Sequence, residues 1–322
     1  MSETLLILGF IILLLAIHDF FYTTLSASGG GFISENVAIL SDRIIQFCAG
    51  TIGRKAYDYH GLFVNLMILF VWLLLIWLGL FLVYSSNPEA ITNSSGRAAY
   101  NWERLYFTGY ILSTLGMGNF KPVSPFFEVV TSCFSFFGFI FFTSSMTYFI
   151  SVSSAVVRKR TLAKSINNLG NQPEIIANKL LSLDPSYSYQ QVHTLQELVD
   201  QHSVSHQAYP VVHYYSRSEE KDCFSINISR LDEALSIIVY SNKGENLQEE
   251  IGLLRAAISN FLQNLDKNFS RSLPNIGKQL NEQDVPSYIN EIDSKNLNER
   301  RRILKSLLKS EGFSWNNVIA EE

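Results

Sequence analysis

The residues with the clearest capacity for chemistry lie at positions 113–119, Ser-Thr-Leu-Gly-Met-Gly-Asn, which we call the glycine segment. Two glycines, Gly116 and Gly118, flank Met117, and the run carries no charge before Lys121. Glycine permits backbone angles that turn successive carbonyl groups to one side. A row of such carbonyls can replace the water shell of a cation. The segment therefore predicts a site for a dehydrated ion.

The residues before the glycine segment predict its surroundings. Residues 102–114 form an apolar stretch that is too short to span a bilayer and too apolar for an exposed loop, so we expect a re-entrant helix. Irregular backbone at membrane depth is tolerated only where protein buries it or where it lines a water-filled cavity. We therefore expect the glycine segment to line a cavity.

Three apolar stretches are long enough to cross a membrane, since about 20 residues at 1.5 Å each span the hydrocarbon core. They cover residues 5–22, 62–84 and 125–157. The first has no basic residues before it, so we expect a retained helix and not a cleaved signal peptide.

The distribution of Lys and Arg predicts the orientation of these spans, because cationic residues stay on the cytoplasmic side. Arg43, Arg54 and Lys55 follow the first span, and residues 158–160 (Arg-Lys-Arg) follow the third. We expect a multi-pass protein of the cell membrane, with the N-terminus and residues 85–124 outside and the C-terminal half in the cytoplasm.

Charge also divides the chain. Residues 1–157 contain 6 Lys/Arg and 8 Asp/Glu, whereas residues 158–322 contain 19 and 21. The net charge of −4 gives no signal for nucleic acid as a partner. We expect an N-terminal span and linker (1–60), a membrane module (61–160) and a mostly helical cytoplasmic domain (161–322), an all-α membrane protein in total.

Residues 113–124 resemble the pore loop of potassium channels, whose usual pattern is T-T-V-G-Y-G-D-x-x-P-x-T. Thr114, Gly116, Gly118 and Pro122 agree with that pattern. Four positions are mild replacements: Ser113, Leu115, Asn119 and Ser124. The resemblance covers about a third of the chain, residues 62–157. It implies a re-entrant pore helix and a filter whose carbonyls, from Thr114, Leu115, Gly116, Met117 and Gly118, coordinate K⁺.

Two departures from the family pattern affect the expected selectivity. In the family an aromatic residue at the position of Met117 braces the filter through hydrogen bonds, and methionine offers only a weak acceptor on a flexible stem. Asn119 lacks the acidic charge that the family places at the outer mouth, so we expect weaker attraction of entering cations. The sequence therefore allows Na⁺ as a second permeant ion.

The third span would be the pore-lining helix under this resemblance. Gly138 lies where the family has a hinge glycine. A helically spaced set could form an apolar inner gate or, equally, pack between helices: Phe139, Phe142, Met146 and Ile150. One such loop cannot enclose an ion, so the chain is expected to form a homotetramer. No span carries the repeated Arg or Lys of a voltage sensor.

The C-terminal half gives fewer functional signals. His202 and His206 have metal-ligand spacing, with His213 nearby, but no carboxylate or Cys matches them, so we expect solvated surface histidines. Arg300, Arg301 and Arg302 are expected on the solvated face of a helix. The sequence contains no GxGxxG motif, so nothing in it indicates a nucleotide-sensing domain. The ligand or protein partner of this domain stays unknown, and no cofactor or metal other than the permeant cation is expected.

The leading hypothesis is a homotetrameric, potassium-conducting channel. The alternatives are a poorly selective monovalent cation channel and a membrane-anchored scaffold with a vestigial pore loop. An ordinary tight turn at the two glycines would leave the apolar residues 105–115 without a burial partner. No nucleophile, acid/base pair or metal constellation predicts an enzyme.

Overall fold

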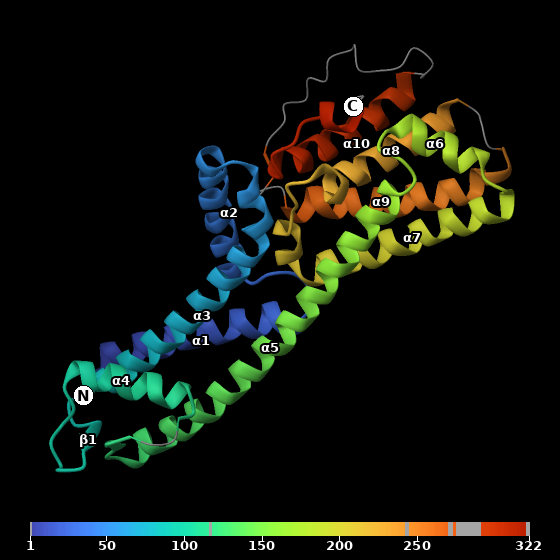
Figure 1. Cartoon of the computed structure of the whole chain (residues 1–322). Coiled ribbons are helices and arrows are strands. Elements are labelled where there is room, and N and C mark those ends of the chain that lie inside the picture. The colour runs from blue at the N-terminus through green and yellow to red at the C-terminus, as the bar shows by residue number, and fades with distance from the viewer. Residues whose placement is uncertain (1, 116–117, 242–244, 270–272, 275–290, 320–322) are drawn as a thin grey trace. The chain divides into compact units, whose positions relative to one another are not determined.

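The computed structural model describes residues 2–115, 118–241, 245–269, 273–274 and 291–319 (Figure 1). Helices dominate, with one small sheet. The elements, with 3₁₀-helices written η, are α1 (Glu3–Leu25), α2 (Phe32–Ile52), η1 (Arg54–Tyr59), α3 (His60–Ser85), β1 (Ile91–Asn93), α4 (Asn101–Leu112), β2 (Phe120–Pro122), α5 (Pro125–Asn167), α6 (Pro173–Ser182), α7 (Pro185–Ala208), η2 (Pro210–Tyr214), η3 (Glu220–Asp222), α8 (Phe224–Tyr240), η4 (Glu245–Leu247), α9 (Gln248–Phe269), α10 (Glu291–Ser310) and α11 (Asn316–Ile319).

Three of these helices, α1, α3 and α5, are long and apolar enough to cross a membrane, which confirms the three predicted spans as helices. The third helix runs ten residues past Val157, so the run at 158–160 lies inside α5 and not after it. Lys and Arg are good helix formers, and nothing in the sequence breaks the helix there.

The described residues form two compact units. One contains residues 1–38 and 65–152, and the other contains residues 39–64 and 153–322. The sequence had grouped residues 39–60 with the first span. The structure ties them to the C-terminal residues instead, for example through Asp58, whose carboxylate accepts hydrogen bonds from the Ser218 backbone N–H (3.0 Å) and hydroxyl (2.7 Å).

In the first unit, α1 and α3 cross at two glycines. A Cβ added at Gly9 would lie 2.8 Å from the Gly79 carbonyl oxygen, and one added at Gly79 would lie 2.8 Å from Leu13 Cγ. Small residues allow such close backbone approach between membrane helices. The crossing therefore depends on both positions lacking a side chain.

A buried carboxylate joins three elements near the end of α1. Asp19 accepts hydrogen bonds from the Ile33 N–H (2.7 Å), the Ser34 N–H (3.1 Å) and hydroxyl, and the Trp72 indole N–H (2.8 Å). Ile33 and Ser34 belong to the first turn of α2, where backbone N–H groups lack helical partners. Gly31 has no room for a Cβ, which would lie 2.2 Å from an Asp19 oxygen. Asp19 thus caps α2 from a neighbouring helix.

A two-stranded antiparallel sheet lies beside α4, and the sequence did not predict it. β1 pairs with β2 in the register Ile91 to Pro122, Thr92 to Lys121 and Asn93 to Phe120. Strands this short carry no readable alternation of polar and apolar residues. The pairing fixes the chain directly after the glycine segment.

The second unit is a helical domain built around α8, whose residues from Phe224 to Ser236 are all buried. Its acids are neutralised from α10: Asp232 binds Arg300, and Glu233 binds Arg301 through its Nε at 2.7 Å. The predicted solvated arginine face is therefore wrong for these two residues. Arg302 does pair near the surface, with Asp266 at 2.9 Å and Glu299 at 2.8 Å.

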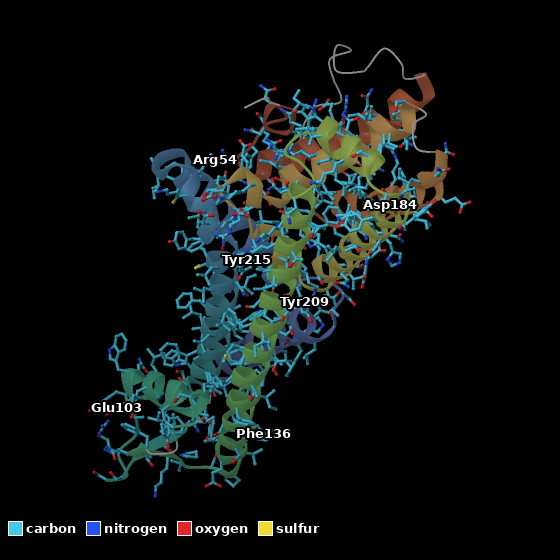
Figure 2. All side chains as sticks on the ribbon, turned by 45° about the vertical axis from the view of Figure 1, so that its right-hand side comes forward. Arg54, Glu103, Phe136, Asp184, Tyr209 and Tyr215 are labelled. Carbon is cyan, nitrogen blue, oxygen red and sulfur yellow. The ribbon has the colours of Figure 1, made fainter. Side chains whose placement is uncertain are left out.

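An Asp-Pro pair at residues 184–185 separates α6 from α7. The Asp184 carboxylate accepts the Ser186 N–H (3.0 Å), and proline occupies the first helical position. Residues 209–215 contain the 3₁₀-helix η2, which Tyr209 and Tyr215 flank in the sequence (Figure 2).

Candidate functional site

The glycine segment follows α4, so the anchoring of this helix sets the site's geometry. At its N-terminus, the Glu103 carboxylate accepts the Tyr100 N–H (2.7 Å) and pairs with both terminal nitrogens of Arg97 (2.7 and 3.1 Å). The Arg97 hydrogen bonds, followed by the Tyr100 N–H, hold the pKa of Glu103 below its ordinary value. Arg104, which is buried, donates to the Pro88 carbonyl (2.9 Å). These contacts fix where α4 begins.

The side of α4 is held against α3 by Trp77. Its indole N–H lies 3.1 Å from the Leu105 carbonyl and 3.0 Å from the hydroxyl of Thr108, which is fully buried. Gly109 makes room for the same ring, because an added Cβ would lie 3.3 Å from it. The Trp77 side chain therefore fixes both the position of α4 along α3 and the distance between the two helices.

The C-terminal end of α4 lies directly against α5. A Cβ added at Gly138 would lie 2.2 Å from the Leu112 carbonyl oxygen. At 1.5 Å per residue, Gly138 is about 20 Å along α5 from Pro125. The last turn of α4 therefore lies against the first third of a candidate membrane span, Pro125–Asn167. The close contact of Gly138 with α4 requires a residue without a side chain at this position. A hinge at Gly138 stays a prediction.

The glycine segment begins with a backbone outlier. Thr114 has φ 55°, one of two positive values among the described non-glycine residues, and β-branched residues rarely adopt this conformation. Such strain is typical of functional sites. Leu115 and Asn119 are exposed, whereas Gly116 and Met117 lie outside the described residues.

Gly118 lies close to an aromatic ring of α4. An added Cβ would lie 3.0 Å from Cζ and 3.4 Å from the hydroxyl oxygen of Tyr110. Tyr110 in turn stacks on Tyr106 (ring centroids 6.3 Å apart), and Tyr106 meets Phe120 edge-on (6.5 Å). Aromatic residues of α4 thus lie beside the C-terminal end of the glycine segment.

The predicted inner-gate residues share one exposed face of α5: Phe139, Phe142, Met146 and Ile150. Phe136, labelled in Figure 2, is exposed one turn earlier. Nearby hydroxyls bond to carbonyls of their own helix, as in Thr147 to Thr143 and Ser151 to Thr147 (both 3.0 Å). The face therefore presents large apolar groups with little unsatisfied polarity, and a gate there stays a prediction.

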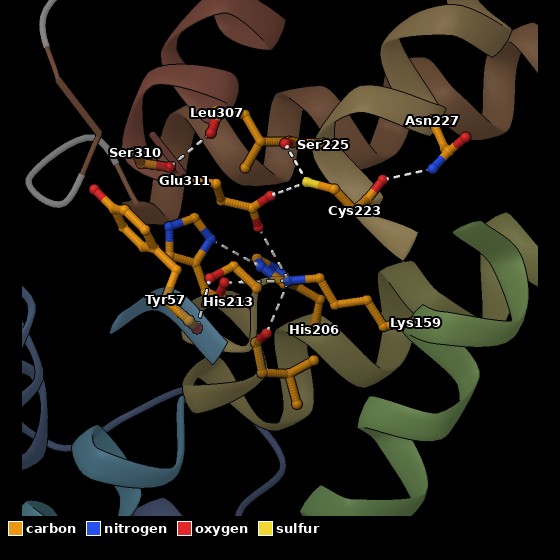
Figure 3. Close-up of polar contacts among 12 residues, drawn as sticks. Tyr57, Lys159, His206, His213, Cys223, Ser225, Asn227, Leu307, Ser310 and Glu311 are labelled. Carbon is orange, nitrogen blue, oxygen red and sulfur yellow. Dashed lines mark hydrogen bonds and ion pairs between the residues drawn. The ribbon is translucent and has the colours of Figure 1, made fainter. Parts of the chain in front are cut away.

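In the second unit, a buried charge cluster surrounds Lys159 of α5 (Figure 3). Its ammonium group donates to the carbonyls of Val212 and His213 (both 3.2 Å) and lies 3.5 Å from a Glu311 oxygen. The other Glu311 oxygen accepts from the thiol of Cys223 (3.1 Å). Burial, then the Glu311 charge, raises the pKa of that thiol. The sequence could not separate Lys159 from its neighbours in the 158–160 run, because its partners lie far along the chain.

The prediction of surface histidines is wrong, since His202, His206 and His213 are all buried. His206 Nε2 lies 3.3 Å from His213 Nδ1, and both rings pack on Phe269 with centroids 4.5 Å apart. Burial and the Lys159 charge lower the pKa of His206 to about 3. Within the described ranges no group of three or more His, Cys, Asp or Glu could hold a metal ion. The three histidines are neutral core residues.

Comparison with known proteins gives one informative relative. No family model matches the chain, and no solved structure matches it. An uncharacterized membrane protein, YdjJ of Bacillus subtilis (strain 168), is 29% identical over 332 residues, which cover 98% of this chain and 96% of the relative. With three helices apolar enough to cross a membrane, the chain is a helical membrane protein that resembles this relative along almost its whole length.

Proposed function

We propose that four copies of this chain form a cation channel that conducts potassium through the glycine segment. The observation that carries the proposal is the position of the Leu112 carbonyl against Gly138, about 20 Å along a candidate membrane span. In this proposal α4, which starts at Asn101 and ends at that position along α5, is a re-entrant helix that enters the membrane from one side. The chain then returns from Gly118 to β2 on the side where it entered.

The polarity of α4 favours a cation at its C-terminal end. The dipole of a helix places a partial negative charge, equivalent to about half an electron, at its C-terminal end. The described residues of the glycine segment carry no charged side chain that would compete with the backbone carbonyls for the cation. The ion's coordination is assigned to backbone carbonyls of residues 114–118, as in the potassium channels that this segment resembles.

The exposed face of α5 fits a symmetric assembly. It presents consecutive turns of large apolar side chains, including Phe139 and Phe142, on the helix that α4 meets at Gly138. Four such faces around an axis would bury part of this surface and line a central cavity with the rest. The C-terminal domain, in the cytoplasm by the charge rule, joins the pore-lining helix through Lys159.

A flux assay tests the proposal. Purified protein in liposomes loaded with K⁺ is expected to release it through the glycine segment. Gly116→Ala is expected to abolish the flux, because a Cβ restricts the backbone angles that turn successive carbonyls to one side. Thr194→Ala, on the exposed surface of α7, is the matched control and should conduct as the wild type does. Undiminished flux through Gly116→Ala would contradict the proposal, and a wild-type protein that never conducts would favour the scaffold alternative.

A further inference from the structure

Helix α2 has an exposed apolar face in the second unit. Leu40, Ile44 and Phe47 follow the i, i+4, i+7 spacing of one helical face. Leu40 is 59% exposed and Phe47 is 79% exposed, and Ile52 at the end of the helix is exposed as well. A contiguous group of large apolar side chains on a surface indicates an interaction site.

The charges around this face have one sign. Between Ile39 and Tyr57 the exposed charged residues are Arg43, Arg54 and Lys55. Asp42, which is the acid in this range, lies buried on the opposite side of α2, with an oxygen 3.2 Å from His60 Nε2 and another accepting from Gln46 (2.9 Å). The exposed face is therefore apolar and cationic.

Chain connectivity limits where this face can lie. η1 follows α2 after one residue and continues directly into α3, and the two together form a candidate membrane span, Arg54–Ser85. Phe47, the last of the three apolar residues on the face, lies seven residues before this candidate span begins. α2 itself carries Asp42 and Arg43 at its centre, so it is suited to lie along a bilayer surface and not to cross it.

We propose that α2 lies in the headgroup layer of an anionic lipid surface, with Leu40, Ile44 and Phe47 toward the acyl chains and Arg43 and Lys55 toward lipid phosphates. A second copy of the same face is a poorer occupant, since a two-fold contact would bring the unopposed cations together. Anionic lipid supplies the missing charge, with each cation near the surface adding about fivefold to the partitioning. This inference concerns binding to lipid and is independent of ion conduction.

A depth measurement on the full-length protein tests it. Phe47→Cys, made with Cys48→Ser and Cys133→Ser, places one environment-sensitive fluorophore on the face, because the remaining Cys223 is buried. Thr194→Cys, on exposed α7, is the matched control site, and Leu40→Cys is a second site on the face if Phe47→Cys fails to fold. The protein is reconstituted in phosphatidylcholine vesicles with and without phosphatidylglycerol, and iodide and lipid-attached nitroxide serve as quenchers.

The fluorophore at position 47 is expected to be quenched by the lipid nitroxide and protected from iodide, more strongly with phosphatidylglycerol. The Arg43→Gln and Lys55→Gln pair should remove that dependence, a loss of about fivefold for each cation. Quenching by iodide equal to that at position 194 would overturn the proposal. Protection that is the same in detergent and in both vesicles would also overturn it, because a second copy would then cover the face.

Discussion

Gly118, in the glycine segment, and Gly138, in α5, have the same physical role. Each lets a group of α4 approach closer than a side chain would permit: the Tyr110 ring at Gly118 and the Leu112 carbonyl at Gly138. Tyr110 of α4 therefore contacts the segment at Gly118, and α5 contacts α4 at Leu112, directly before the segment. Tyr110 occupies this supporting position in a chain where Met117 cannot hydrogen-bond as an aromatic would.

Removing the Tyr110 ring is expected to weaken ion selectivity. Tyr110→Ala leaves a space behind Gly118, so the filter loses rigidity and Na⁺ permeability should rise relative to K⁺. A loss of about 1.4 kcal/mol in discrimination corresponds to a tenfold change in the permeability ratio. Tyr110→Phe keeps the ring and should retain selectivity, as should Trp102→Ala, whose side chain is 81% exposed. Equal reversal potentials for Tyr110→Ala and wild type would show that the ring does not support the filter.

The sequence identified residues of the candidate site, but it did not predict whether individual polar residues are buried or exposed. The two glycines marked the segment from sequence, whereas the contact of Gly118 with the Tyr110 ring was not predictable. The histidines at 202 and 206, and the arginines at 300 and 301, were expected in solvent because they are polar. Their buried partners are distant in the sequence: the two histidine rings pack on Phe224, Phe261 and Phe269, and the two arginines pair with Asp232 and Glu233.

At the scale of elements, Asp19 gives the first span a structural role. Its carboxylate satisfies the first turn of α2 and the Trp72 indole of α3 at once. The sequence contained a signal for this, since an acid within an apolar span is expensive and indicates a specific role. Its partners were not predictable because they belong to two other elements.

Asp19→Asn is expected to loosen α2. The amide retains one oxygen to accept hydrogen bonds where the carboxylate has two, and hydrogen bonds to charged groups contribute about 1.5–3 kcal/mol each. Backbone amides of Ile33 and Ser34 should exchange faster with deuterium, and the midpoint of thermal unfolding in detergent should fall. Glu3→Gln, at the exposed start of α1, is the control and should change neither. Unchanged exchange at both amides would mean that Asp19 does not cap α2.

The packing of α7 and η2 around neutral histidines predicts acid sensitivity of the second unit. The pKa of His206 is about 3 when folded and about 6.5 when unfolded, so only the unfolded chain binds the proton as pH falls below 6.5. His202 and His213 shift in the same direction. The free energy of unfolding should therefore fall by about 1.4 kcal/mol per histidine for each pH unit below 6.5.

Thermal unfolding of the full-length protein between pH 8 and pH 5 measures this effect, with pH 5 chosen to stay above the folded pKa of His206. His206→Gln should reduce the pH dependence, and His193→Gln, an exposed position of α7, should leave it unchanged. A stability that stays constant down to pH 5 would refute the assignment of neutral, buried histidines.

At the scale of the whole molecule, hydropathy predicted the three long helices because a membrane span needs about 20 consecutive apolar residues, and each of these helices contains such a run. The division into units was less predictable. Residues 39–64 belong with the C-terminal domain through long-range contacts such as Asp58 with Ser218, and the pairing of β1 with β2 joins two strands of three residues each. Local pattern does not encode either association.

The reversal potential of single channels in a planar bilayer, with potassium on one side and sodium on the other, tests the central claim most directly. Conduction through the carbonyls of the glycine segment predicts a reversal potential displaced toward the potassium equilibrium potential, and Gly116→Ala should remove the current. A current that reverses near zero would contradict potassium selectivity and leave a poorly selective cation pore.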